Sequence, residues 1–182
     1  MFAATTPSVE SRLTIHRLSP GESKVFLVLS NSVTAINTHW TQRTRLCVGQ
    51  ERCPACFIGL QPRWIGFVPV QTAAGVPGLL EITASSGHHW LGDLEGQEVY
   101  GMVIEVTRKS QHSGIMAVRS ERYKRALPMA WSGEEVFDAI ARILQLPRRR
   151  NYLDADLWRN GIETAAIGQL NLDLGIKATA GN

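Results

Sequence analysis

The sequence predicts a mainly β fold, closed as a small Greek-key barrel and followed by an α-helical appendix. Five or six short runs rich in β-branched and aromatic residues are separated by turn-forming residues, which is typical of such a barrel. A longer helical pattern of apolar residues appears after Pro128. All three cysteines lie between two of the strand-like runs, which predicts that they share one inserted loop.

The first two strands are predicted over residues 24–29 and 33–40. The first run is short and strongly apolar, and the second alternates apolar and polar residues. Asn31-Ser32 between them has the composition of a tight turn, so we expect these strands to pair as a hairpin. Further strands are predicted over residues 63–70, 79–85, 99–108 and 115–125, with a short helix over 87–94. The last two strands flank turn residues and form a second predicted hairpin.

One amphipathic helix is predicted over residues 134–146. Ser132 is its expected N-cap, and Glu135 three residues later completes a capping box. Pro147 ends the helix, and residues 152–158 are expected to dock as a short second helix. The chain therefore divides into three predicted parts: a flexible N-terminal arm over residues 1–20, a β domain over 21–127, and a C-terminal helix and tail over 128–182.

Composition and charge limit the classes of partner and compartment. The hydrophobic fraction of 44% is ordinary for a globular protein. The net charge of +3 permits an acidic partner, and fifteen of the nineteen cationic residues are Arg, which favours forked contacts with phosphate. No apolar run reaches the length of about eighteen residues that a membrane span needs, so no membrane segment is expected. Free thiols fit a reducing compartment, so we expect a cytoplasmic protein.

The loop over residues 39–56 holds four side chains of the kinds that bind zinc: His39, Cys47, Cys53 and Cys56. Cys53-Pro-Ala-Cys56 has the spacing with which a tight turn brings two thiolates onto one ion, and the other two residues would supply the remaining corners. Four protein ligands predict a closed, structural Zn2+ site. Two alternatives stay open: partly buried free thiols beside a core histidine, and a redox pair, although the βαβ context of such a pair is not visible.

Cationic and aromatic side chains are interleaved around this loop and along the later strands. Cations contact phosphates and flat rings stack on unpaired bases, so the combination predicts a surface for single-stranded nucleic acid. The predicted contact residues are Trp40, Arg43, Arg45, Arg63, Trp64, Trp90, Tyr100, Arg108, Lys109, Arg119, Arg122, Tyr123 and Lys124. The alternative is that Trp40 and Phe57 cover the metal, while the arginines form a solvated face.

A histidine followed by a cysteine and then Cys-x-x-Cys, inside a β-rich domain, resembles the zinc-containing single-stranded-DNA-binding proteins of tailed phages. The stretch from Leu79 through Asp93-Leu94 to Arg108 also looks like phage and plasmid binding proteins of the oligonucleotide/oligosaccharide-binding (OB) type. The resemblance covers roughly residues 24–125. It implies an OB-fold barrel with a zinc-binding loop, the same four ligands, and single-stranded DNA in a basic groove.

These features predict a non-catalytic protein that binds single-stranded DNA with little sequence preference. Proteins of DNA replication or recombination, and further copies of the chain, are the other expected partners. A zinc deaminase would need His-x-Glu and Pro-Cys-x-x-Cys, and here Thr41 and Arg52 occupy the Glu and Pro positions, so no enzyme activity is expected. A zinc-stabilised adaptor for a protein partner and a binder of single-stranded RNA stay open as alternatives.

Overall fold

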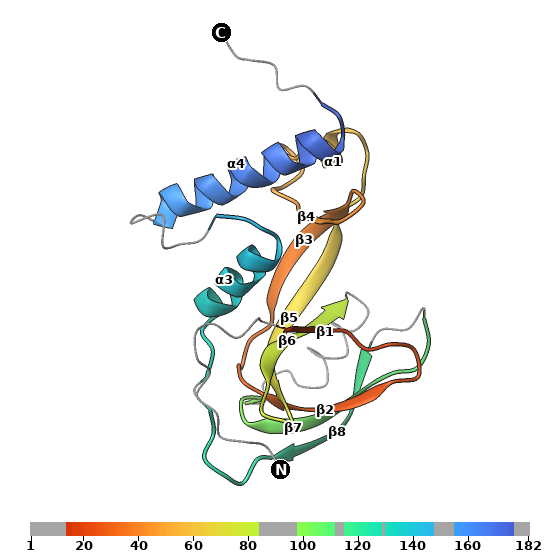
Figure 1. Ribbon diagram of the computed structural model, residues 1–182, viewed down its shortest axis with the longest axis vertical. Helices are drawn as coiled ribbons and strands as arrows, with labels where there is room; N and C mark the ends of the chain where they lie inside the picture. The colour runs from red at the N-terminus through yellow and green to blue at the C-terminus, as the bar shows by residue number, and fades with distance from the viewer. Residues whose placement is uncertain (1–13, 84–97, 112–114, 129, 148–154, 177–182) are drawn as a thin grey trace. The chain divides into compact units, whose positions relative to one another are not determined.

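A computed structural model describes the chain over residues 14–83, 98–111, 115–128, 130–147 and 155–176 (Figure 1). Residues 116–120 and 155 are described by their backbone alone. The chain forms two compact units: unit 1 comprises residues 1–35 and 65–136, and unit 2 comprises residues 36–64 and 137–182. This division differs from the predicted one, because the cysteine loop and the C-terminal residues belong to the same unit.

All eight strands of the described residues precede the two long helices. The strands are β1 (Thr14–His16), β2 (Ser23–Val28), β3 (Thr34–Trp40), β4 (Thr44–Leu46), β5 (Arg63–Thr72), β6 (Pro77–Thr83), β7 (Met102–Arg108) and β8 (Ile115–Arg122). The helices are α1 (Pro54–Phe57), α3 (Gly133–Ile143) and α4 (Ala155–Asp173).

The eight strands belong to one mixed sheet, which is open. Six of them follow the order β1-β6-β5-β2-β7-β8, while β3 and β4 lie off this path. The mainly β prediction is confirmed, but the sheet is not closed into the predicted barrel: within the described residues, the outermost strands β1 and β8 do not pair with each other. β1 pairs in parallel with residues Gly78 to Leu80 of β6. It therefore occupies the edge of β6 with which a strand that closed the barrel would have to pair.

The predicted strand over residues 24–29 is confirmed as β2, but its predicted hairpin with the next strand is wrong. β2 lies between β5 and β7, with Phe26 opposite Thr72 on one side and Ile104 on the other. The side chains from Phe26 to Leu29 are buried, which explains the continuous apolar run in the sequence. The following strand, β3, pairs with β4 within unit 2.

The predicted hairpin of the last two strands is confirmed as β7 and β8, which pair along the whole length of β7. β7 begins at Met102 rather than Val99, because the preceding residues turn at Gly101, whose φ is +78°. The strand then alternates, and Met102, Ile104 and Val106 are buried. Together with buried residues of β2, β5 and β6, they supply the apolar core of unit 1.

The predicted capping box of α3 is confirmed. The N–H of Glu135 donates to Oγ of Ser132 at 3.2 Å, and the N–H of Ser132 donates to the carboxylate of Glu135 at 2.8 Å. The helix ends at Ile143, earlier than predicted, and Gln145 follows in the left-handed region with φ +59°. Pro147 therefore lies outside the helix rather than directly ending it.

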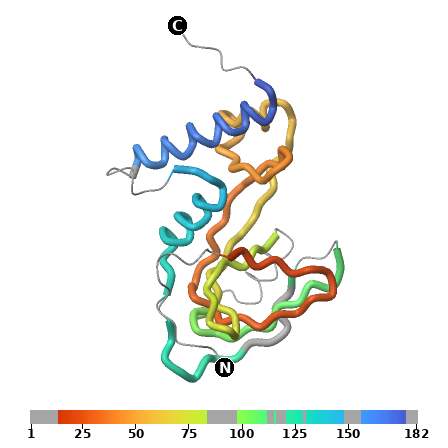
Figure 2. Tube along the Cα trace, in the orientation of Figure 1, coloured from red at the N-terminus to blue at the C-terminus, as the bar shows by residue number. Residues whose placement is uncertain are grey.

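The last helix is much longer than predicted: α4 spans Ala155–Asp173 instead of a short segment around residues 152–158. Ile162, Ala166 and Leu170 recur every four residues and are buried, so they form its inner face. Within unit 2, α4 contacts β4 and α1, both of which belong to the cysteine loop (Figure 2). Of the described helices, none, α4 included, is long and apolar enough to cross a membrane.

Candidate metal centre

The antiparallel hairpin of β3 and β4 fixes the position of the histidine. His39 lies opposite Arg45, and Trp40 lies opposite Thr44, with Gln42 at φ +66° in the connecting turn. Side chains alternate between the two faces of a strand, so His39 and Arg45 share one face, and both are buried. Trp40 points to the other face, where 73% of it is exposed. The hairpin thus separates a ligand-bearing inner face from an outer face that carries a tryptophan.

The three cysteines lie in the segment after the hairpin, residues 47–60, which we call the knuckle. Cys47 directly follows β4, Cys53 directly precedes α1, and Cys56 lies within α1. Gly49 reverses the chain with φ +101°, a conformation that favours glycine, and its carbonyl accepts the N–H of Cys53 at 2.9 Å. Pro54 opens α1 at a position where no N–H is needed. The local sequence therefore folds Cys-x-x-Cys into a turn followed by one helical turn.

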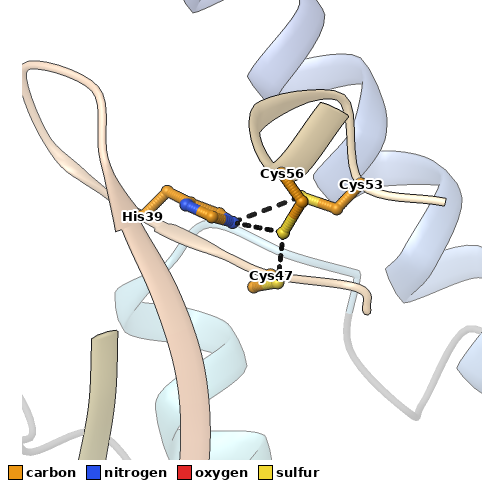
Figure 3. Close-up of side chains that lie close together, drawn as sticks. All are labelled: His39, Cys47, Cys53 and Cys56. Carbon is orange, nitrogen blue, oxygen red and sulfur yellow. Dashed lines mark hydrogen bonds between the residues drawn. The ribbon is translucent and has the colours of Figure 1, made fainter. Parts of the chain in front are cut away.

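The four predicted ligands converge (Figure 3). Nε2 of His39 lies 3.3 Å from Sγ of Cys56 and 3.4 Å from Sγ of Cys53. The Sγ atoms of Cys47 and Cys56 are 3.6 Å apart, and all four ligand atoms lie within 4.8 Å of one another. A tetrahedron with metal–ligand distances of about 2.0–2.3 Å has edges of about 3.3–3.8 Å, which these three distances match. The residues form a Cys3His group arranged like a metal-binding site.

Burial and hydrogen bonding shift the thiol pKa values in opposite directions. Burial raises the pKa of Cys53, but the backbone N–H groups of Cys56, Ala55 and Val48 outweigh it and hold this pKa below its usual value. Burial raises the pKa of Cys47, and burial together with the neighbouring thiols raises the pKa of Cys56 to about 12. Metal ions bind the thiolate, so a bound cation would replace the protons that these two groups otherwise retain.

The surroundings of His39 favour its neutral imidazole. Only 2% of the residue is exposed, and burial lowers the pKa of His39 more than the backbone carbonyl of Gln61 raises it. The neutral imidazole is the form that coordinates a metal, and its Nε2 faces the thiols (Figure 3).

Helix α4 forms one wall of the Cys3His group. Leu170 is fully buried in one apolar cluster with Cys53 and Ala55. Leu174, one turn further along, packs against the same cluster, as does Cys47 with its neighbour Val48 and Cys56. The wall keeps water from one side of the ligands and ties the end of the chain to the knuckle.

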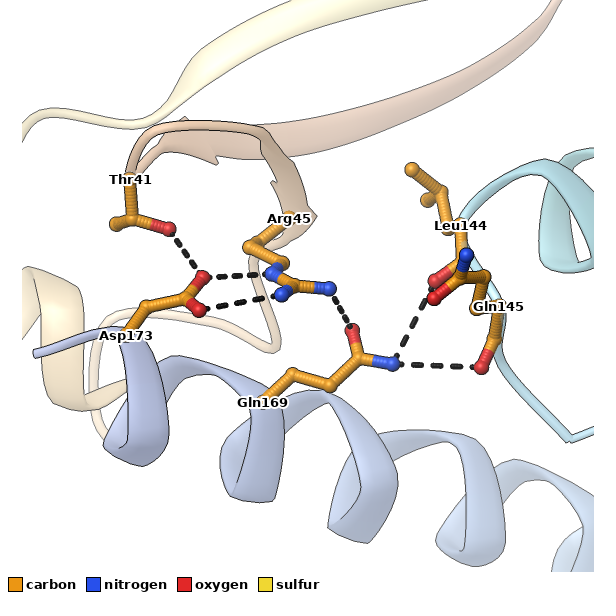
Figure 4. Close-up of polar contacts among 6 residues, drawn as sticks. All are labelled: Thr41, Arg45, Leu144, Gln145, Gln169 and Asp173. Atoms are coloured by element: carbon orange, nitrogen blue, oxygen red, sulfur yellow. Dashed lines mark hydrogen bonds and ion pairs between the residues drawn. The ribbon is translucent and has the colours of Figure 1, made fainter.

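A polar network also joins α4 to the hairpin (Figure 4). Nε and Nη2 of Arg45 donate to the two carboxylate oxygens of Asp173 at 2.7 and 3.1 Å, and Oγ1 of Thr41 donates to the same carboxylate at 2.7 Å. Nη1 of Arg45 donates to Oε1 of Gln169 at 3.0 Å, and Nε2 of Gln169 donates to the carbonyl of Gln145 at 3.3 Å. The side chains of the ion pair are only 9% and 16% exposed.

Replacing Asp173 with asparagine is expected to lower the free energy of unfolding near neutral pH, because the buried Arg45 loses its charged partner. A buried polar group left without its partner costs about 1–3 kcal/mol. Hydrogen bonds from Arg45 and Thr41 lower the pKa of Asp173 from 3.8 to about 2. The folded pKa lies below the unfolded value, so this stabilisation is present above pH 3.8 and is lost as the pH falls through about 2.

Urea unfolding of wild type and Asp173→Asn between pH 7 and pH 2 measures this effect. Acid also protonates other groups of both proteins, so the relevant quantity is the difference in unfolding free energy between them, which should shrink as the pH approaches 2. Asp156→Asn, at an exposed position on the same helix, is the matched control. A difference that stays constant down to pH 2 would contradict the assignment of this stabilisation to the contact between Arg45 and Asp173.

The predicted nucleic-acid contacts in unit 2 differ in exposure. Trp40, Arg43 and Arg63 are exposed, and within the described ranges neither arginine forms an ion pair. Trp64 is half-buried. Arg45 is not available to phosphate, because its guanidinium is buried and holds the carboxylate of α4. It links the hairpin to α4.

Several predicted contacts in unit 1 are engaged in the fold. The hydroxyl of Tyr100 donates to a backbone carbonyl, Arg108 donates to two backbone carbonyls at 2.8 and 3.0 Å, and Arg122 pairs with a carboxylate at 3.2 Å. Of the other predicted contacts, Lys109 and Lys124 are exposed, Tyr123 is half-buried, and Trp90 and the side chain of Arg119 lie outside the described residues.

Sequence reasoning missed two features of the site. Phe57 is 85% exposed and Trp40 is 73% exposed, so neither ring covers the Cys3His group as the alternative supposed. The contacts from α4 through Leu170 and Asp173 were also missed, although the four-residue apolar spacing that ends at Leu170 could have indicated a longer helix.

Comparison with known proteins gives no relative: no family model, no curated protein and no solved structure matches the chain. The resemblance to phage and plasmid binding proteins therefore stays a prediction, and the site is interpreted from its own geometry.

Proposed function

We propose that the Cys3His group holds a structural Zn2+ ion through Nε2 of His39 and the thiolates of Cys47, Cys53 and Cys56. Three sulfur donors and one imidazole are the donor set that zinc prefers, and four protein ligands leave no open position for water or substrate. The ion would hold together a hairpin and a knuckle that contribute little apolar core of their own. This chemistry supports a structural rather than a catalytic metal.

We further propose that the protein binds single-stranded DNA without catalysing a reaction. The observation that carries this proposal is the exposed aromatic and cationic group at the end of β3. Oγ1 of Thr38 donates to the backbone carbonyl of Arg63 at 3.1 Å, so Arg63 lies beside β3. Trp40 lies on the same face of β3 as Thr38, two residues further along, and Arg43 follows in the turn. All three side chains are exposed.

This arrangement suits a single strand better than a duplex. An exposed indole stacks on an unpaired base of any sequence, which contributes about 1–3 kcal/mol per base, while the two guanidinium groups contact phosphates. Stacking and phosphate contacts read no base edges, so slight sequence preference is expected. Replication and recombination expose single strands and remain the processes that we propose for the protein, with further copies of the chain as candidate partners. We assign no enzyme activity and place the protein in the cytoplasm as part of the same proposal.

Titration of the intrinsic tryptophan fluorescence with oligo-dT, at two salt concentrations, tests the proposal. We expect quenching by the single strand, weaker at high salt because binding releases counterions, and little response to a duplex of equal length. An oligo-U of the same length distinguishes RNA from DNA. Equal binding of single strand and duplex, or no response to any nucleic acid, would contradict the proposal.

A protein partner is the second candidate, and a specific observation favours it. The knuckle exposes three apolar side chains in a short stretch: Phe57, Ile58 and Leu60 are 85%, 56% and 38% exposed. Exposed apolar groups in one stretch are typical of interaction sites. In this case the zinc would stabilise an adaptor module. The fluorescence titration would then give no response to nucleic acid, and Phe57→Ala would abolish capture of the protein partner.

A further inference from the structure

We propose that helix α4 is part of the metal site and sets its affinity, with Leu170 and Asp173 as positioning residues. The inference rests on the metal binding proposed above and goes beyond it, because neither residue touches the ion. According to this proposal, the C-terminal helix helps to determine the affinity of the site for the metal.

The first argument is apolar contact with the ligands themselves. Leu170 is fully buried in the same cluster as Cys53, and Ala55 completes that cluster from the middle of the Cys-x-x-Cys turn. Without Leu170, the buried thiol of Cys53 would face a cavity or water. The knuckle would then lose the packing that fixes the direction of its Sγ atoms, and ligand direction is a main determinant of metal affinity.

The second argument is the position of Arg45 between two ligands. It lies opposite His39 in the hairpin and two residues before Cys47. Its guanidinium is held by Asp173, so the carboxylate of α4 fixes β4, which leads directly into Cys47 and pairs with the strand that carries His39. Without that carboxylate a buried cation would be left unpaired, and β4 would have to move to hydrate it.

The third argument is thermodynamic reciprocity. If the docked helix favours the metal-bound arrangement of the knuckle, then bound metal must favour the docked helix by the same factor. Loss of metal should therefore release α4, and weakening of the helix contact should weaken metal binding. The two effects are measured by different experiments on the same full-length chain.

Zinc affinity is measured by competition with a chromophoric chelator for wild type, Leu170→Ala and Leu172→Ala. Leu172 lies two residues further along α4 and is 83% exposed, so its replacement removes the same side chain without touching the knuckle. Asp173→Asn, with Asp156→Asn as its control, repeats the test without making a cavity. We expect Leu170→Ala and Asp173→Asn to bind zinc about tenfold or more weakly and both controls to match wild type, since supporting groups change metal affinity about 10–100-fold.

Two further readouts separate positioning from general unfolding. In the Co2+-substituted chain, the d–d bands of tetrahedral Cys3His coordination should shift or weaken in Leu170→Ala but not in Leu172→Ala. Amide exchange should rise in residues 162–174 after zinc is removed from wild type, while strands β2 and β7 keep their protection. If Leu170→Ala and Asp173→Asn bind zinc as tightly as wild type, or α4 stays protected without metal, the inference is overturned. If wild type binds no zinc, the proposed metal itself fails.

Discussion

Replacing Cys53 and Cys56 together with serine is expected to abolish metal binding and to unfold unit 2. Structural zinc sites contribute about 10–16 kcal/mol of apparent binding free energy at pH 7. This is comparable with the net stability of a whole domain, which is about 5–15 kcal/mol. Apolar packing around the knuckle is limited, because the fully buried cluster there consists of Cys53 and Ala55 together with Leu170 of α4. Thermal unfolding and the zinc content of the purified chain measure the two losses.

Phe57→Ala is the matched control for that substitution. It changes the residue next to Cys56, but its side chain is 85% exposed and contributes little to the core. We expect it to retain one zinc ion per chain and the melting temperature of wild type. An unchanged melting temperature in the double serine variant, with no zinc in either protein, would refute the structural metal.

Replacing Arg43 and Arg63 with alanine is expected to weaken single-strand binding and to flatten its salt dependence. Each phosphate contact contributes about 0.7 to the slope of log K against log salt for a single strand, so the double variant should lose about 1.4 from the slope. Adding Trp40→Ala should remove one stacked base, at about 1–3 kcal/mol. Fluorescence anisotropy with labelled oligo-dT at several salt concentrations gives both quantities.

Arg17→Ala serves as the control for charge, because it removes an exposed cation of unit 1 whose partner is Glu81. It should leave the salt slope unchanged. Arg45 is excluded from this series, since its replacement would break the ion pair with Asp173 and change folding rather than binding. If the double arginine variant and Arg17→Ala bind alike at all salt concentrations, the proposed contact surface is in the wrong place.

The sequence indicated the metal ligands and most strands because these signals are local. His39 and the three cysteines lie within one short loop, and the spacing of Cys53 and Cys56 alone predicts a turn that brings two thiols together. β2, β5 and β7 are marked by apolar or alternating runs. The capping box of α3 is likewise encoded by two residues three positions apart, Ser132 and Glu135.

Pairing between strands was harder to predict because it depends on distant segments. The turn at Asn31-Ser32 suggested that β2 and β3 pair, but β2 is placed between β5 and β7. The prediction that the sheet closes into a barrel was wrong for the same reason, because β1, which lies in the predicted N-terminal arm, pairs with β6. Helix α4 was underestimated because its burial depends on the knuckle, and Asp173 carried no local sign of a partner as distant in sequence as Arg45.

The composition of unit 2 from two separate segments has a consequence for synthesis of the chain. The knuckle leaves the ribosome with residue 60, but its covering helix is complete only when residue 174 has emerged. At about 5–20 residues per second, the thiols remain uncovered for about 6–23 s on the nascent chain. During that interval the loop is open to ions and oxidants, and the site can close only after residue 174 has emerged. Residues of α4, made long after the knuckle, therefore decide when the ligands become protected.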